Sequence, residues 1–267
     1  MLATFTLRVP ESKRLIAKAV KELPEVKKAL QHHKIIVAGG TTNAYVAEEL
    51  IGEGLRREYY TAGTINQGLP CVTDPEHRIE PLTLKAGQKQ EQDWLDFLDS
   101  FGSEDVFIKG ANAFDAQGVA GVLAAHPEGG TVGFSLGTLV ARGAQLIIPV
   151  GLEKRIDSVQ RASKMVGIEQ IDYSLGRKVG LIPISNGKII TELESLEILT
   201  GVKAEQIAAG GIGDSAGAVT LVIEGEEEQV TKTMSLIKGL KGEPALEGNR
   251  RSCSICNDQC NRVLNIE

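Results

Sequence analysis

The sequence predicts an α/β protein, with a doubly wound, mostly parallel sheet followed along the chain by a smaller, ferredoxin-like α+β domain. Short apolar runs, of which 34–38 and 145–150 are the clearest, alternate with segments whose apolar residues recur at helical spacing. A glycine follows each of these two runs directly. Strands that alternate with helices in this way are typical of a parallel sheet covered by helices.

The larger domain is expected over residues 1–174. The apolar spacing of 11–31 predicts a helix, which Pro24 divides because proline is poorly tolerated in a helix interior. We expect the strand at 34–38 to lead into a helix over 42–51. The other expected elements are strands at 59–65, 105–109 and 145–150, an edge strand at 82–84, and helices at 90–101 and 136–142.

A second, ferredoxin-like domain is expected over 175–248, where the pattern of elements changes. The expected order is a strand (179–184), a helix (191–200), two strands (205–212 and 218–223) and a helix (226–240). This is the β-α-β-β-α order of a ferredoxin-like unit, which one further strand can close. Residues 249–267 are left as a tail that carries three of the four cysteines.

Composition limits the classes of partner. The formal net charge of -6 argues against a nucleic-acid partner, which needs a basic surface. No apolar run reaches the roughly 18 residues of a membrane helix, and the first residues lack the features of a secretion signal. We therefore expect a cytoplasmic protein without a membrane partner, and the sequence leaves a homo-oligomer open.

The segment Gly39-Gly40-Thr41-Thr42-Asn43 is the first candidate ligand site. The two glycines let the backbone approach a ligand closely, and Thr41, Thr42 or Asn43 can cap the following helix. Open N–H groups in the first turn of a helix attract anions, phosphate in particular. The alternative is a plain strand-to-helix turn, since neither a Walker loop nor G-x-G-x-x-G is present.

Polar groups follow two further expected strands. Gly110, Asn112 and Asp115 come after the strand at 105–109, and Lys154 comes after the strand at 145–150. The carboxyl ends of parallel strands are where ligands bind in open α/β folds. An Asx turn at Asn112 and a solvated helix start at Lys154 are the alternatives.

The segment His126-Pro127-Glu128-Gly129-Gly130 offers two acid–base groups. His126 and Glu128 can transfer protons if they face a cleft. An exposed turn is the alternative, because proline and glycine are common in turns.

Taken in order, these motifs resemble a known superfamily. The Gly-Thr turn, the Lys-Gly-Ala-Asn segment and the Val-Gly-Leu-Glu-Lys segment are similar to those of ribose-5-phosphate isomerase, glucosamine-6-phosphate deaminase and the CoA transferases, and closest to the lactate-utilisation (LUD) domains. The resemblance covers about residues 12–165. It implies that Gly39–Asn43 hold a phosphate or CoA-like group, and that Asn112, Asp115 and Lys154 face the ligand.

Two departures from this superfamily bear on catalysis. Where the isomerase has Asp-Gly-Ala-Asp-Glu, this chain has Lys-Gly-Ala-Asn-Ala at 109–113, so the acid–base carboxylates of that enzyme are missing. The glutamate nucleophile of the CoA transferases has only Glu128 as a counterpart. Fold resemblance does not assign a reaction. Asp115, Glu128 and Lys154 remain as candidate catalytic residues.

Cys253, Cys256 and Cys260 form a C-x-x-C-x-x-x-C motif. Close spacing lets three thiolates reach one centre, and soft sulfur ligands suit zinc or an iron–sulfur cluster. Reduced thiols on a frayed tail are the alternative. A fourth ligand is open among Cys71, a histidine, a second subunit and a substrate.

Two classes of function follow from the sequence. In the first, the protein binds a small anionic metabolite (a sugar phosphate, a CoA ester or an organic acid) and acts on it as an enzyme. In the second, it is a non-catalytic sensor or accessory metalloprotein that uses the C-terminal cysteines.

Overall fold

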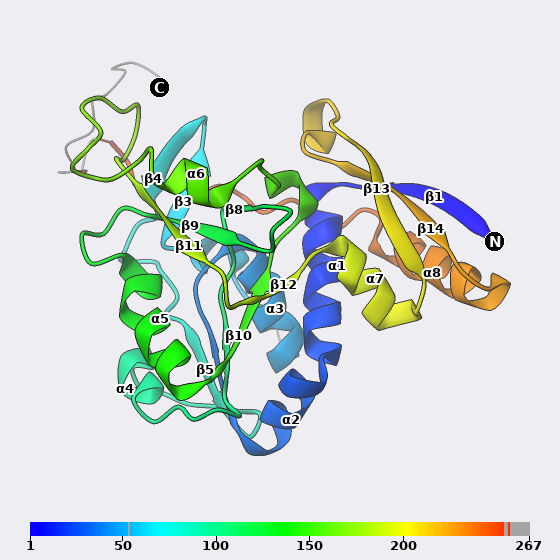
Figure 1. Ribbon diagram of the computed structural model, residues 1–267, viewed down its shortest axis with the longest axis horizontal. Helices are drawn as coiled ribbons and strands as arrows, with labels where there is room; N and C mark the ends of the chain where they lie inside the picture. Colours follow the sequence, from blue (N-terminus) through cyan, green and yellow to red (C-terminus); the bar gives the residue numbers. More distant parts are fainter. Residues whose placement is uncertain (53, 254–255, 257–267) are drawn as a thin grey trace.

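The computed structural model describes residues 1–52, 54–253 and 256, and its centre is a six-stranded sheet (Figure 1). In spatial order the strands are β12 (Lys188–Ile190), β10 (Gln145–Pro149), β7 (Val106–Ile108), β2 (Lys34–Val37), β5 (Leu82–Lys85) and β6 (Gln88–Lys89). The first four are parallel, β5 pairs antiparallel with β2, and β6 pairs antiparallel with β5. The predicted α/β class is confirmed, and the sheet is mixed.

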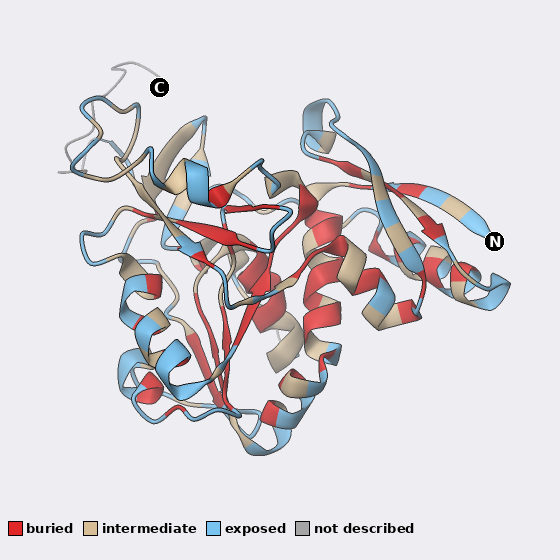
Figure 2. Cartoon of the chain, viewed as in Figure 1, coloured by how far each residue is buried: buried red, intermediate tan, exposed pale blue. Residues whose placement is uncertain are grey.

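Helices cover both faces of this sheet because its strands are apolar on both sides. Ile36 and Phe107 pack with α4 (Trp94–Leu98) and α5 (Gly130–Arg142). Ile35 and Ile108 pack with α1 (Val9–Glu22), α2 (Pro24–His32) and α3 (Thr41–Ile51). Figure 2 shows the strands buried between these two helix layers. Within the described ranges, no helix is long and apolar enough to cross a membrane.

The predicted break at Pro24 is confirmed. Pro24 occupies the first turn of α2, where its missing N–H costs nothing, and Leu23 between the two helices is extended. The helix after β2 is also confirmed, and it ends at Gly52 in the left-handed conformation that favours glycine.

The strand expected at 59–65 is replaced by a short 3-10 turn and a hairpin. The turn is η1 (Arg57–Tyr59), and the hairpin joins β3 (Gly63–Asn66) to β4 (Leu69–Val72) through Gln67 and Gly68, both with positive φ. Tyr60, which was expected in that strand, is instead buried in the core. Its hydroxyl donates to Val37 O (2.5 Å) and accepts from Leu82 N–H (2.9 Å). The expected edge strand, β5, is flanked by β2 and β6.

The domain boundary expected at residue 175 does not match the strand pairing. β11 (Gly180–Ile184) pairs with β9 (Ala120–Ala124), which also pairs with β8 (Ala113–Phe114), and β12 joins the central sheet. Both strands thus belong to the larger body. Their partners lie far away in sequence, so local periodicity did not reveal them.

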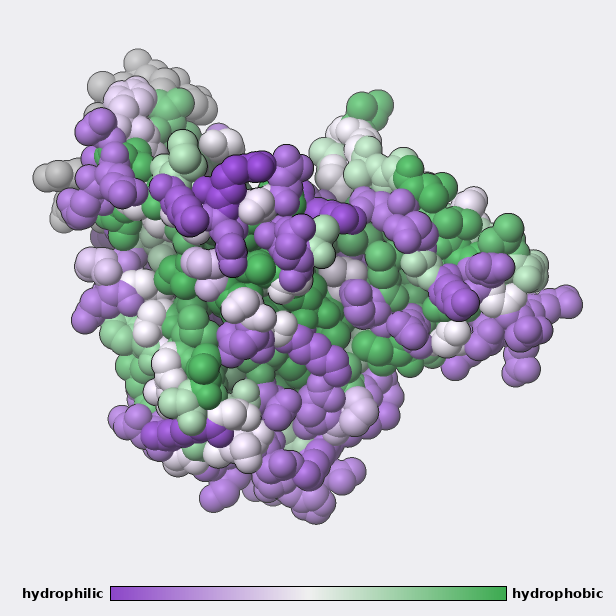
Figure 3. Space-filling model, viewed as in Figure 1, coloured by the Kyte–Doolittle hydropathy of each residue, from purple (hydrophilic) through white to green (hydrophobic). Residues whose placement is uncertain are grey.

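A smaller sheet has the order β1 (Leu2–Leu7), β14 (Val219–Glu224) and β13 (Lys203–Ala209), all antiparallel. The strand that completes it comes from the N-terminus rather than from 175–184. Helices α7 (Glu192–Thr200) and α8 (Glu227–Leu240) pack with its buried residues. Apolar side chains, including those of Ile207 and Ile212, are exposed on the β13–β14 hairpin (Figure 3).

We expect Tyr60→Phe to lower the free energy of unfolding by about 1–3 kcal/mol. The substitution leaves Leu82 N–H buried without an acceptor, which costs more than the average hydrogen bond. Urea denaturation measures the change. Tyr59→Phe is the matched control, because the Tyr59 hydroxyl makes no hydrogen bond to the described residues, and equal losses in the two variants would contradict this account.

Candidate functional site

The carboxyl ends of the four parallel strands lie along one edge of the central sheet. β2 leads into Gly39 and Gly40, and β7 leads into Lys109 and Gly110. β10 leads into the 3-10 turn η2 (Leu152–Lys154), and β12 leads directly into α7. Because parallel strands end on the same side, the groups that follow them come together.

The turn after β2 presents open backbone donors. Gly40 is the N-cap of α3, and no side chain caps the helix. Among the described residues, no acceptor pairs with the N–H groups of Thr41, Thr42 and Asn43. A Cβ at Gly39 or Gly40 would meet its neighbours only at ordinary contact distances, so packing within the protein does not require glycine there. The two glycines leave the backbone accessible to a ligand.

Asn43 ties this turn to the next strand instead of pointing away from the protein. Its Nδ2 donates to Ala38 O (2.7 Å) and Ile108 O (3.1 Å), which joins the ends of β2 and β7. Its Oδ1 and the Oγ1 of Thr42 are buried without a hydrogen-bond partner in the described part of the chain. A Cβ at Gly110 would lie 3.4 Å from Asn43 Oδ1, so the amide lies in contact with the turn after β7.

Three lysines from different elements meet at this edge. Lys109 Nζ donates to Gly110 O (3.0 Å) and Lys154 Nζ donates to the neighbouring Ala111 O (3.0 Å). Lys13 comes from α1. In the ranges described, no carboxylate lies within ion-pair distance of any of the three ammonium groups.

Burial and mutual repulsion change the acidity of these lysines. Burial lowers the pKa of Lys109 to about 8, and the positive charge of Lys154 contributes to the shift. Burial also lowers the pKa of Lys13 to about 8, with Lys154 acting in the same direction and Glu153 against it. The three groups are therefore close enough to interact electrostatically.

A buried carboxyl group lies at the same edge of the sheet, beside η2. Glu192, in the first turn of α7, is fully buried, and its Oε2 accepts from Leu152 N–H (2.9 Å) while Oε1 has no partner among the described residues. Burial, with the nearby Glu153 acting in the same direction, raises its pKa to about 7. Glu192 is thus a carboxyl group that exchanges its proton near neutral pH.

Two of the sequence-predicted residues have other roles. Asp115 is buried, and its oxygens accept from the N–H groups of Gln117, Val119 and Val159, so it stabilises the turn between β8 and β9. Asn112 is exposed, and its Oδ1 accepts from Leu123 N–H (3.0 Å). These bonds to the backbone give both side chains structural roles.

Glu128 lies on an exposed turn before α5, where its N–H donates to His126 Nδ1 (3.2 Å). The described residues supply no interaction that would place its carboxylate in a cleft. The exposed-turn alternative accounts for this segment.

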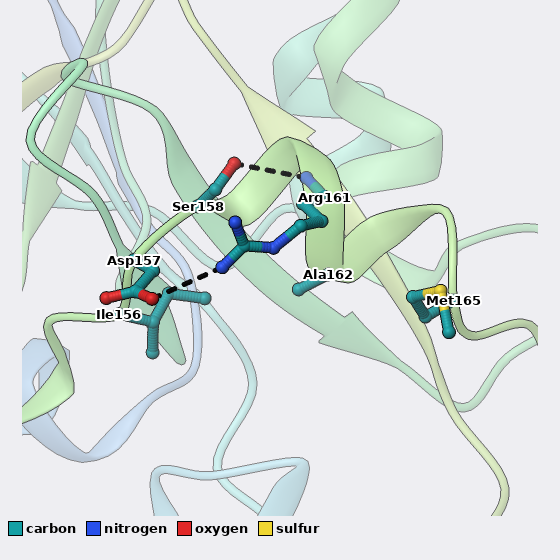
Figure 4. A pocket seen from close by; sticks show the side chains of 6 residues that line it. All are labelled: Ile156, Asp157, Ser158, Arg161, Ala162 and Met165. Atoms are coloured by element: carbon teal, nitrogen blue, oxygen red, sulfur yellow. Dashed lines mark hydrogen bonds and ion pairs between the residues drawn. The ribbon is translucent and has the colours of Figure 1, made fainter.

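A surface hollow lies beside α6 (Val159–Ser163), directly after η2 in the chain (Figure 4). In it Arg161 pairs with Asp157 (3.2 Å), and Ser158 caps the helix through Arg161 N–H. None of the lysines or carboxyl groups of the sheet-edge cluster lines this hollow. Its residues are Ile156, Asp157, Ser158, Arg161, Ala162 and Met165.

The predicted metal ligands are only partly within the described chain. Cys253 is exposed and Cys256 is partly buried, whereas Cys260 lies outside the described residues. No group of three or more His, Cys, Asp or Glu side chains is already arranged for metal binding in the described ranges. The metal site stays a prediction.

Sequence reasoning missed Lys13, Lys109 and Glu192 as site residues. A signal existed for Lys13: it precedes Ile16, Ala17 and Val20 by three, four and seven residues, and so shares the buried face of α1. For Glu192 there was none, because the three-residue strand β12 before it was not recognised.

We expect Glu192→Gln to stabilise the protein at pH 8 but not at pH 4.5. The pKa of Glu192 is raised in the folded state, so the folded protein binds its proton more tightly, and stability falls as pH rises from about 4.5 to 7. Removing the charge should gain about 3 kcal/mol at pH 8. Urea denaturation at both pH values tests this, with the exposed Glu197→Gln on the same helix as control. A gain that does not depend on pH would contradict the assignment.

We compared the chain with models of protein families, with curated proteins and with solved structures, and none of them matches it. The chemistry of the sheet edge is therefore the basis for a functional hypothesis.

Proposed function

We propose that this protein binds a small anionic metabolite, carrying a phosphate or carboxylate group, at the carboxyl edge of its parallel strands. One observation carries the proposal: Lys13, Lys109 and Lys154 gather there without a carboxylate partner among the described residues. The open N–H groups at the start of α3 support it, since they attract anions as well.

The electrostatics favour a bound anion. Two like charges about 4 Å apart repel by about 4 kcal/mol at an effective dielectric constant of 20. An anion between the lysines would convert this repulsion into attraction and restore the pKa values of Lys13 and Lys109 toward their usual range. Lysine ammonium groups bind phosphate as point charges, without the bidentate geometry of an arginine guanidinium.

Acid–base chemistry on the bound metabolite is the activity we propose. Glu192, with a pKa of about 7, and Lys109, with a pKa of about 8, can each gain or lose a proton near neutral pH. Sugar phosphates, CoA esters and organic acids are the substrate classes we expect. A sensor that binds the same anion without turnover is the alternative, and an assay for substrate conversion separates the two.

We expect Lys109→Ala and Lys154→Ala to weaken anion binding at least tenfold. Each removes a cation that would contact the anion, and hydrogen bonds to charged groups contribute about 1.5–3 kcal/mol. Isothermal titration with inorganic phosphate, ribose 5-phosphate, coenzyme A and lactate measures the affinity of each variant. Lys232→Ala on α8 is the matched control, because this lysine is exposed and has no carboxylate partner in the described chain.

Thermal stability provides the check. A bound anion should raise the melting temperature of the wild-type protein and of Lys232→Ala, but not of Lys109→Ala. The proposal fails if all of these ligands leave the wild-type melting temperature unchanged. It also fails if Lys109→Ala and Lys232→Ala bind equally well.

A further inference from the structure

Lys109 has a fixed position directly after the central strand β7. Its N–H donates to Ile147 O in β10 (2.9 Å), and the O of the preceding Ile108 accepts from Ala38 N–H, directly after β2 (2.9 Å). The backbone is therefore held by both neighbouring strands. Groups carried on strands are positioned more precisely than groups carried on loops, so the Lys109 side chain starts from a defined point of the sheet edge.

The Lys109 amine lies beside a second amine rather than beside a carboxylate. Its Nζ donates to Gly110 O (3.0 Å), and Lys154 Nζ donates to the next carbonyl, Ala111 O (3.0 Å). In the part of the chain that the structure describes, no carboxylate forms an ion pair with either amine. Both lysines are partly accessible to solvent.

These are conditions under which a lysine becomes a nucleophile. The free amine attacks a carbonyl carbon, and a lysine gains this form near neutral pH in a desolvated site or beside another cation. Burial and the charge of Lys154 lower the pKa of Lys109 to about 8, so about a tenth of it is the free amine at pH 7. For an ordinary lysine, with a pKa of about 10.4, the fraction is about one in 2,500.

The open N–H groups of α3 lie next to this amine. Asn43, in the first turn of α3, donates through Nδ2 to Ile108 O (3.1 Å), and a Cβ at Gly110 would lie 3.4 Å from its Oδ1. Lys109 is the residue between these two contacts of its strand with the helix start. A molecule held there by an anionic group therefore has Lys109 as an immediate neighbour.

We propose that Lys109 forms a covalent imine with a small metabolite that carries both a carbonyl and an anionic group, such as a 2-oxo acid or an open-chain sugar phosphate. The inference rests on the anion site proposed above and narrows its ligands to those with a carbonyl. Covalent intermediates divide one difficult step into easier ones, which suits the acid–base chemistry proposed for this site.

The step needs no oxidant or reductant. The free amine attacks the carbonyl carbon, a C=N bond replaces the C=O bond, and the oxygen leaves as water. One proton returns to the nitrogen, so that an ammonium group and a carbonyl become an iminium group and water. Because the iminium keeps the positive charge of Lys109, the anionic group of the metabolite keeps this partner.

Reductive trapping tests the imine. Sodium cyanoborohydride converts it into a stable secondary amine, which mass spectrometry maps to a single lysine. The probes are pyruvate and dihydroxyacetone phosphate at pH 7, which separate a carboxylate from a phosphate as the anionic group. We expect at least one probe to modify Lys109 at least tenfold faster than the exposed Lys232 of α8. Dihydroxyacetone, which has the carbonyl without the anionic group, should modify Lys109 at least tenfold more slowly than that probe.

The variant Lys109→Arg separates the imine from the anion site, because it keeps the positive charge and cannot form an imine. Its adduct yield should fall below a tenth of the wild-type yield, while inorganic phosphate should still raise its melting temperature. Lys232→Arg is the matched control and should form the adduct as the wild type does.

Two sets of results would overturn the inference. If phosphate stabilises the wild-type protein but neither probe modifies Lys109 faster than Lys232, the imine is excluded and the anion site stands. Trapping that maps to Lys13 or Lys154, or an equal yield in Lys109→Arg, has the same meaning. If neither phosphate nor the probes bind or react, the imine and the proposed function fail together.

Discussion

The packing of α1 between the two sheets is the interaction on which the rest of the structure depends. One side of the helix packs on α3 and the central sheet, and the other packs on α7. Leu15, Ile16, Ala19 and Val20 are fully buried. Burying a leucine or isoleucine side chain contributes about 1.5–3 kcal/mol, so this helix holds together elements from both ends of the chain.

The same helix carries charged groups to three places. Lys13 reaches the sheet edge, and Arg14 pairs with Glu48 and Glu49 on α3 as well as with the tail. Glu11 accepts from Lys241 beyond α8 (2.9 Å). The candidate anion site, the tail and the small sheet are thus all contacted from about one turn of the same helix. An anion at the sheet edge would therefore interact with an element that all three share.

Local patterns predicted the parts of the fold that depend on local physics. The break at Pro24, the helix after Gly40 and the strand at 145–149 all follow from periodicity and the special residues beside them. The pairing of β12 with β10 could not be read in this way. A three-residue strand has no detectable period, and its partner lies about 40 residues earlier in the chain.

The candidate site was likewise predictable only where its residues follow strands that the local sequence reveals. The glycine turn at 39–40 and Lys154 follow strands that periodicity identifies, so their place at the edge could be expected. The role of Asp115 could not be predicted in this way. Its residue type fits a catalytic carboxylate, but the backbone N–H groups of three different residues donate hydrogen bonds to its oxygens. Whether a carboxylate is free depends on the folded loop around it.

The pairing of β1 with β14 has a consequence for biosynthesis. β1 pairs in register with residues 219–224, so during synthesis it has no partner until these residues have been made. Such distant contacts form slowly, and an unpaired strand is exposed to association with other chains in the interval. The central sheet can assemble first, because its strands lie within residues 34–190. The small sheet would then be completed only after residues 219–224 have been made, and β1 would need protection until that moment.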